Sequence, residues 1–474
     1  MSSTTADERR VGEATIDILS DDALSTIFFH CKDVFSSDLS WWQPLVHVCR
    51  RWRHVIFGSP LHLNLTLVCT ARTPARESLD IWPPIPIVLH FTSYERRGHN
   101  ENIIAAMERP DRITDIRLMN LTIHNFQELT RTMAMESPFP ALTYLQLRGF
   151  GMPENGWNDS FVLRDVFLGG SAPSLRTFIL DGISFPALSK LLLTTTQLVT
   201  LQLSSVPTLR NMSLRVVVTC LAALPNLKYL SIIHFYKFPD LDQSPLSTRA
   251  VLPSLTSFYF HGVSGSLEDL ATRIDAPMLR TLSLTLGGLI HIPQLLRFTS
   301  HAEKLKLPIR AIFVFEIWRF LLKFLPSDGF EFATRDHKSF GQFMTMVSLC
   351  SALTPLLSHV ERLDFHCGQF SPLKQEFVDP MPWLALFRPF TAVRSLYVSK
   401  KVWPRVGPVL QALTGESASE AFPELRTLFL EEPSEEARKS IETLVGMRGI
   451  TIQPCTASDF VDESQSPSLS WHRW

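Results

Sequence analysis

The sequence lacks the features that several large classes of protein require. Its 474 residues carry 45 Lys and Arg against 46 Asp and Glu. The resulting net charge of −1 gives no broad attraction for nucleic acid or an anionic membrane. The seven cysteines are scattered and form no Cys-x-x-Cys pair, which argues against a zinc ribbon and a disulfide framework. We therefore expect reduced thiols and a location in the cytoplasm or nucleus.

Long hydrophobic runs are also missing. The first ten residues, MSSTTADERR, are polar and charged and have no apolar core of a signal peptide. The most apolar stretch, 308–326, carries four charged residues, of which Glu316, Arg319 and Lys323 share one face of a helix. A membrane span would not carry four charges in that length. We therefore expect a helix with one polar stripe there, in a soluble protein with no membrane partner.

Motifs of catalysis and metal binding are missing too. The sequence has no His-Glu-x-x-His, no Gly-rich phosphate loop and no Gly-x-Ser-x-Gly elbow. His47 and His54 are seven residues apart, a spacing more typical of a helix surface than of a metal site. The basic residues of 50–54 are better explained as a solvated helix face than as a phosphate site. We expect no catalytic residue, metal, cofactor or nucleic-acid partner.

Helical spacing is present from about residue 16 to residue 58. Ser20 can cap a helix, and Asp21 and Asp22 place negative charge in its first turn. A second run begins near Pro44 and ends at 58–60. The apolar residues at offsets i, i+3, i+4 and i+7 are Leu24, Ile27, Phe28 and Cys31 in the first run, and Leu45, Val48, Cys49 and Trp52 in the second. Such short helices need a partner surface or the following domain to bury these faces.

From about residue 112 the pattern changes to strand-like apolar triplets, which recur every 23 to 33 residues over the first eight units. This period is that of leucine-rich repeats. The triplets are centred on 116, 145, 178, 201, 230, 258, 282, 305, 363, 396 and 428, and a weak unit at Phe330-Glu331-Phe332 fills the one double gap. A proline precedes several units and would end the preceding helix.

Each unit is therefore predicted to be a strand plus a helix, as at 343–357, with one strand face buried against the helices. The polar residue that usually follows the last leucine of a repeat is replaced by an apolar one in the early units. The positions are Leu121, Phe150, Ile183, Val206, Phe235 and Val263. Because the asparagine ladder is missing, the coil is expected to be irregular.

The fold class that follows is α/β, with a small all-α helical module before an irregular leucine-rich-repeat solenoid. We predict disordered tails at 1–13 and 454–474. Between them lie the helical module at 14–60, a connecting segment with extended strands and the first cap of the solenoid at 61–111, and the solenoid at 112–453.

Residues 18–60 resemble an F-box. The segment Ile18-Leu19-Ser20-Asp21-Asp22-Ala23-Leu24-Ser25-Thr26-Ile27-Phe28 is similar to the opening helix of that family. Val46-His47-Val48-Cys49-Arg50-Arg51-Trp52 is similar to its later helix. With the Trp41-Trp42 pair and 57–61, the segment resembles the multi-copy F-box proteins of mushroom-forming fungi, and the likeness extends loosely into the repeats. It departs from the family in having Ser20 in place of the usual proline and an insertion-like stretch at 32–43.

The resemblance implies docking on the Skp-type adaptor of an SCF (cullin–RING) ubiquitin ligase, with cullin as an indirect partner. The residues that would supply this contact are Leu19, Leu24, Ile27, Phe28, Val48, Cys49 and Trp52. The alternative is that the same residues are buried against the repeat domain or within the module itself.

A client protein would bind the residues that lie between the last two apolar positions of each triplet, because these point off the strand to the open surface. The candidates are Ile179, Tyr259, Lys306, Asp364, Tyr397 and Phe429. Exposed aromatic residues are typical binding anchors. The alternative is that loops or tails cover them.

Two hypotheses of function follow. The first is a non-catalytic substrate-recognition adaptor of a ubiquitin ligase, which takes part in protein ubiquitination without performing chemistry. The second is a ligase-independent protein-binding scaffold with a vestigial F-box. An enzyme built on the repeats would require a clustered acid–base or metal site, which the sequence does not predict.

Overall fold

The computed structural model describes residues 16–34, 40–73, 75–92, 100–133, 139–149, 161–234, 249–287, 292–302, 308–315, 320–325, 330–334, 339–367, 380–403, 406, 421–432 and 449–456. The chain divides into two compact units, Met1–Gly151 with Val166–Ser174, and Met152–Asp165 with Leu175–Trp474. Both units combine helices and strands, and most strand pairs are parallel. The predicted α/β class is therefore confirmed.

The first unit begins with short helices, η1 (Ile16–Ile18), α1 (Asp21–Val34), α2 (Gln43–Val46) and α3 (Arg50–Gly58). Ser20 Oγ accepts a hydrogen bond from the Ala23 amide (3.2 Å), which confirms the predicted cap of α1. The second helical run is divided in two, because Cys49 is extended and caps α3, with its Sγ accepting from the Trp52 amide (3.5 Å). Leu45 and Val48 therefore do not share a helix with Trp52.

Four parallel strands follow, paired in chain order: β1 (Leu67–Cys69), β2 (Ile87–Thr92), β3 (Ile113–Leu121) and β4 (Tyr144–Gly149). The helices of this part are α4 (Ala75–Ile81), α5 (Asn100–Met107) and α6 (Ile123–Met133), with η2 (Phe167–Gly170) beyond them. A tryptophan pair joins the N-terminal helices to the sheet. Buried Trp42 donates from Nε1 to the Thr66 carbonyl (3.0 Å), and its ring meets that of Trp82 edge to face at 4.5 Å. The helices and β1 are thereby joined by direct contacts.

The second unit contains one large sheet, whose strands have the spatial order β5, β6, β7, β9, β11, β14, β13, β12, β15, β16, β17, β18. Their bounds are β5 (Thr177–Asp181), β6 (Thr200–Ser204), β7 (Tyr229–His234), β9 (Ser257–Val263), β11 (Thr281–Gly287), β12 (Arg310–Phe315), β13 (Phe320–Leu325), β14 (Phe330–Thr334), β15 (Arg362–Cys367), β16 (Ser395–Val398), β17 (Thr427–Glu431) and β18 (Thr451–Cys455). A separate two-stranded sheet pairs β8 (Ala250–Val251) with β10 (Ile274–Asp275).

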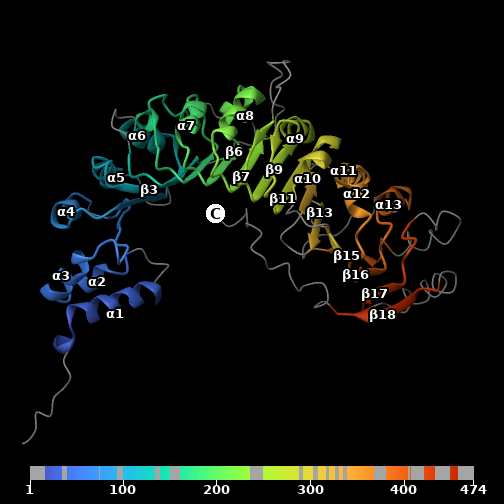
Figure 1. Cartoon of the computed structure of the whole chain (residues 1–474), viewed down its shortest axis with the longest axis horizontal. Helices are drawn as coiled ribbons and strands as arrows, with labels where there is room; N and C mark the ends of the chain where they lie inside the picture. The colour runs from blue at the N-terminus through green and yellow to red at the C-terminus, as the bar shows by residue number, and fades with distance from the viewer. Residues whose placement is uncertain are drawn as a thin grey trace, which may run out of the picture. The chain divides into compact units, whose positions relative to one another are not determined.

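Helices lie along one face of this sheet (Figure 1). They are α7 (Leu188–Thr194), α8 (Leu214–Ala222), α9 (Ser264–Ala271), α10 (Pro293–Ser300), α11 (Ser339–Ala352), α12 (Thr354–Leu357) and α13 (Pro380–Phe387), with η3 (Pro207–Arg210) between β6 and α8. The strand residues that face them are buried and alternate with half-buried residues on the opposite face, as the burial of β5, β9 and β11 shows. We call this opposite face the open face.

The triplet pattern predicts most strands correctly. The units centred on 116, 145, 178, 201, 230, 258, 282, 363, 396 and 428 are strands β3–β7, β9, β11 and β15–β17. The weak unit at Phe330-Glu331-Phe332 is β14, which pairs parallel with β11. The triplet at 305 lies outside the described residues. The sheet continues to Cys455, two residues past the predicted end at 453, and the predicted tail at 1–13 is outside the described part of the chain.

The helix predicted over 308–326 is wrong. This stretch forms β12 and β13, an antiparallel pair in which Phe313 lies opposite Leu322 and Val314 opposite Leu321. Its dense β-branched and aromatic side chains suit a strand buried on both faces. Of the three charged residues of the predicted stripe, Lys323 lies in β13, whereas Glu316 and Arg319 are outside the described residues. The predicted helix at 343–357 is confirmed as α11 and α12.

A left-handed residue forms the bend after several strands. Gly182 (φ 68°) and Ser205 (φ 53°) directly follow β5 and β6 and precede the buried apolar residues Ile183 and Val206. The amides of both turn residues still donate to the neighbouring strand, Gly182 to the Ser204 carbonyl and Ser205 to the Ile233 carbonyl (2.9 Å each). Buried apolar side chains after a left-handed turn thus replace the asparagine ladder here.

Candidate protein-binding surfaces

The residues predicted to contact an adaptor fall into two groups. Leu24 is 0% and Phe28 1% exposed, so neither presents a surface to a partner. Phe28 packs edge to face on Trp52, with ring centroids 5.0 Å apart, and so forms part of the interior of the helical module. Leu24 and Phe28 are therefore removed from the predicted adaptor-contact set.

The other five residues retain accessible surface. Ile27 of α1 is 43% exposed and Val48, between α2 and α3, is 59% exposed. Cys49 is exposed, whereas Leu19 and Trp52 are half-buried. Exposed aliphatic side chains on a module that already has its own interior are available for a partner. The segment also exposes Ile18 and Val34, which the sequence analysis did not include; only their apolar character could have indicated them.

Two of the basic residues of α3 bind the module itself. The Arg51 guanidinium pairs with the Asp21 carboxylate (2.8 Å) and donates to the Leu19 carbonyl, while Arg53 Nε donates to the Val46 carbonyl (3.0 Å). These contacts connect the starts of α1 and α3 and close the turn after α2. They favour the structural explanation of this basic group over phosphate binding.

The predicted client-binding residues lie in one row across the open face of the second unit. The register from β5 to β17 is Ile179, Gln202, Ser231, Tyr259, Ser283, Glu331, Lys323, Ile312, Asp364, Tyr397 and Phe429. Ile179, Tyr259, Tyr397 and Phe429 are half-buried, as expected for residues on a strand face. Lys306 lies outside the described residues.

Asp364 is in this row but cannot contact a client. Its side chain is 0% exposed, because the guanidinium groups of Arg310 and Arg362 cover it. Arg362 Nε donates to Oδ1 (2.9 Å), and Arg310 Nε donates to Oδ2 (2.9 Å). Asp364 therefore serves as a buried counter-ion that holds two arginines at the surface.

A column of flat groups extends from these arginines across β15–β17. The Arg362 guanidinium lies 3.6 Å from the centroid of the Tyr397 ring, and the Tyr397 and Phe429 rings stack at 4.1 Å with an interplanar angle of 7°. Cation–π and stacked aromatic contacts at these distances are favourable. The result is a rigid platform on the open face with positive charge at one end.

A second aromatic pair lies nearer the start of the sheet. Tyr229 of β7 and Tyr259 of β9 stack at 4.9 Å with an interplanar angle of 29°. Burial raises the pKa of the Tyr229 hydroxyl, and the neighbouring Tyr259 raises it further. Both phenols are therefore neutral donors and acceptors at physiological pH.

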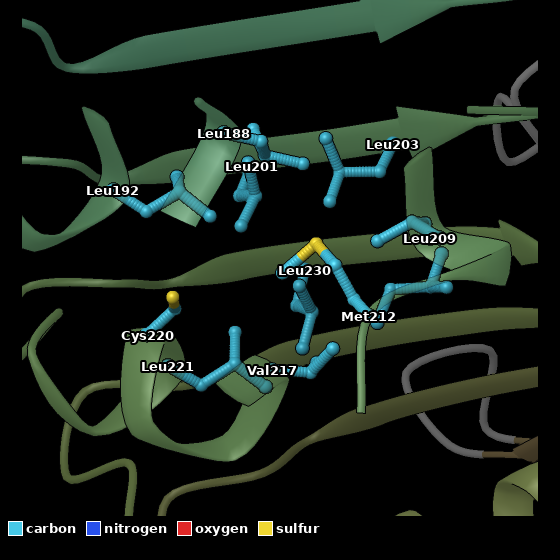
Figure 2. A pocket seen from close by; sticks show the side chains of 11 residues that line it. Leu188, Leu192, Leu201, Leu203, Leu209, Met212, Val217, Cys220, Leu221 and Leu230 are labelled. Carbon is cyan, nitrogen blue, oxygen red and sulfur yellow. The ribbon is translucent and has the colours of Figure 1, made fainter. Parts of the chain in front are cut away.

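One small cavity among the described residues is part of the core. It lies between α7, α8 and the strands β6 and β7, and its volume is about 10 Å³, roughly that of one water. All the labelled side chains around it are Leu, Val, Met or Cys (Figure 2). A space this small with no polar group is packed interior and not a ligand site.

Metal-binding clusters and membrane-spanning helices are both absent from the residues that the structure describes. Within them, no three His, Cys, Asp or Glu side chains converge to hold a metal ion. Over the same ranges, none of the helices has the length and apolar character needed to cross a bilayer.

Comparisons with known proteins add little. No protein-family model matches the chain, and no curated protein matches it in sequence. One solved structure, a Bacteroides fragilis protein from a structural-genomics programme, aligns with 81% of this chain and 73% of its own at 10% identity and a TM-score of 0.15. A likeness at that TM-score carries no argument about fold or function.

Proposed function

We propose that this chain is a non-catalytic substrate-recognition subunit of an SCF (cullin–RING) ubiquitin ligase. In this proposal α1–α3 act as an F-box that docks on a Skp-type adaptor, and the strand-plus-helix units act as an irregular leucine-rich-repeat solenoid that holds a client protein. The observation that supports it best is the exposure of Ile27 on α1 and of Val48 between α2 and α3, in a helical module whose interior around Leu24 and Phe28 is already filled.

The energetics are compatible with docking. Fully burying an aliphatic side chain contributes roughly 1.5–3 kcal/mol, and association costs about 4–15 kcal/mol. The docking set that remains after removing the two interior residues is Leu19, Ile27, Val48, Cys49 and Trp52. Binding by these alone is modest, so Ile18 and Val34 are natural additions to the contact.

The test is co-purification of the full chain with a co-expressed Skp-type adaptor and cullin. The Ile27→Asp/Val48→Asp variant places two charges on the proposed face without touching the module's interior. Ile123→Asp on α6 is the matched control, because Ile123 is similarly exposed at 39% and starts a helix, where a carboxylate is tolerated. We expect capture of both partners by the wild type and the control, and its loss in the double variant.

Failure of the folded wild type to bind the adaptor would contradict the ligase proposal. The chain would then be the ligase-independent scaffold with a vestigial F-box. Circular dichroism and thermal melting of each variant separate loss of docking from loss of the fold.

A further inference from the structure

The open face of β5, β6, β7, β9 and β11 carries no lysine or arginine in the three register rows that cross it. The rows are Thr177-Thr200-Tyr229-Ser257-Thr281, Ile179-Gln202-Ser231-Tyr259-Ser283 and Asp181-Ser204-Ile233-His261-Thr285. We call these fifteen residues the hydroxyl face, since ten of them are Ser, Thr or Tyr. With 19% of the chain charged, about three Asp, Glu, Lys or Arg would be expected among fifteen residues; Asp181 at the margin is the one present.

Charge begins where this face ends. The strand next to β11 places Glu331 beside Ser283, and Lys323 of β13 follows in the same row. The Arg310–Asp364–Arg362 group lies farther along. The sheet therefore presents two chemically distinct regions, of which only the first is without fixed cations.

The side chains of the hydroxyl face reach the surface. All are half-buried except Ser204 and Ser231, which are buried. The stacked Tyr229–Tyr259 pair lies on β7 and β9, with Tyr229 in the first row and Tyr259 in the second. Depletion of charge and the presence of tyrosine rings are two features that this face shares with the core of a protein–protein interface.

A charged partner would be disfavoured here. A carboxylate or phosphate group placed on the Tyr pair would lose its water and meet no lysine or arginine in the three rows, which is costly. Hydroxyl groups and the Gln202 amide instead donate and accept hydrogen bonds, and so fit peptide groups and neutral polar side chains. The tyrosine rings provide a flat apolar surface, and the surrounding hydroxyl groups provide uncharged hydrogen-bond donors and acceptors.

We propose that the hydroxyl face is the client site and that it selects an unphosphorylated segment of protein without charged side chains. This inference rests on the proposed function, in which the repeats hold a client. Its consequence for regulation is that phosphorylation of the client segment weakens recognition, because a phosphate on a bound Ser or Thr finds no lysine or arginine in the three rows. Association is also insensitive to ionic strength, since no charge pair forms.

The test uses the full chain bound to its Skp-type adaptor and a phage-displayed library of random peptides as the probe. We expect the recovered peptides to be poor in Asp, Glu, Lys and Arg. A synthetic peptide from the set should change in affinity by no more than about twofold between low and high salt. Phosphorylation of one of its Ser or Thr residues should weaken binding by about tenfold or more.

Variants locate the site. Ser283→Lys puts a cation in the hydroxyl face at a half-buried position and is expected to abolish peptide binding, whereas Ser300→Lys, at the exposed end of α10 on the helix-covered face (Figure 1), leaves it unchanged. Ser283→Thr keeps the hydroxyl and is expected to bind as the wild type does. Recovery of acidic or phosphorylated peptides whose affinity falls with salt would overturn the inference. It would also be overturned if every recovered peptide bound Ser283→Lys as well as it binds the wild type. Adaptor capture, measured on the same preparations, reports separately on the ligase proposal.

Discussion

The rings of Tyr397 and Phe429 lie face to face on adjacent strands, with centroids 4.1 Å apart and planes 7° from parallel. Their backbones are register partners in β16 and β17, so the stack is a cross-strand pair of the kind that stabilises a sheet. Arg362 extends the stack by one layer and is itself held by Asp364. The geometry of the platform therefore depends on a carboxylate that no solvent reaches.

Replacing that carboxylate is expected to unfold this part of the sheet. Asp364→Ala leaves Arg310 and Arg362 close together without their counter-ion, and breaking a buried ion pair costs roughly 3–5 kcal/mol. The control is Glu361→Ala, which removes an exposed partner of Arg394 and should cost less than about 1 kcal/mol. Urea denaturation of both variants measures the difference, and equal midpoints would show that the arginines do not depend on Asp364.

The left-handed turns predict opposite effects at two equivalent positions. Ser205→Gly is expected to raise the free energy of unfolding by about 1 kcal/mol, because glycine removes the strain of a positive φ. It also removes a buried hydroxyl for which the described residues offer no hydrogen-bond partner. Gly182→Ala should lower the same quantity by about 1 kcal/mol through strain alone, since the added Cβ meets no atom within 4 Å. Shifts of the same sign in the two variants would contradict this explanation of the bend.

The tryptophan pair predicts how the N-terminal helices are held. Trp42→Phe keeps the buried ring but removes the hydrogen bond to the Thr66 carbonyl, which should cost about 1–3 kcal/mol. We expect faster amide hydrogen exchange in α2 and α3, with little change in β3. Phe57→Leu, which alters a half-buried ring 5.8 Å from Trp42, is the milder comparison. Unchanged rates of amide hydrogen exchange in α2 and α3 would mean that Trp42 does not stabilise their packing next to β1.

Burial of the thiols predicts a selective reaction. Desolvation raises the pKa of Cys220 to about 11, so only about one in a thousand of these thiols is ionised at pH 8. We expect iodoacetamide to modify exposed Cys49 in the folded protein and to reach Cys220 only after unfolding. Mass spectrometry of peptides from a time course measures both rates.

The same shift gives a pH dependence of stability. The unfolded thiol ionises near pH 9.0 whereas the folded thiol stays protonated to about pH 11. The folded state therefore binds the extra proton in this interval, and the contribution of Cys220 to the free energy of unfolding falls as the pH rises through it. Cys220→Ser should show a weaker decline over the same range; an identical decline would assign the effect to other groups.

Much of the fold could be predicted because local patterns and tertiary packing agree. The Ser20 cap starts α1 where expected, and the apolar triplets predict the strands and which of their faces is buried. The helix predicted over 308–326 failed because a charge spacing that fits a helical stripe also fits two strands and the connection between them. The pairing of β12 with β15 distinguishes the strand structure from a helix, and no local sequence pattern contains this pairing.

The candidate sites were predictable by position but not by exposure. A helical period shows that Leu24, Ile27 and Phe28 are apolar neighbours, but not that α3 covers the first and third of this set. Strand alternation places Asp364 on the open face, yet the guanidinium of Arg310, which covers it, comes from a residue 54 positions earlier. The lack of lysine and arginine on the hydroxyl face becomes visible only when register aligns five strands.

The order β11, β14, β13, β12, β15 also has a consequence for how the sheet is assembled. Up to β11, each strand of the second unit's sheet joins the strand made before it, and growth is sequential. The strand next to β11 is β14, which is synthesised after β12 and β13. Addition of strands in chain order therefore stops at β11. The three strands from 310 to 334 form a meander of short-range antiparallel contacts, which closes faster than the long-range parallel pairs on either side. The meander is thus placed to act as a second folding nucleus, from which β15–β18 grow independently of the earlier strands.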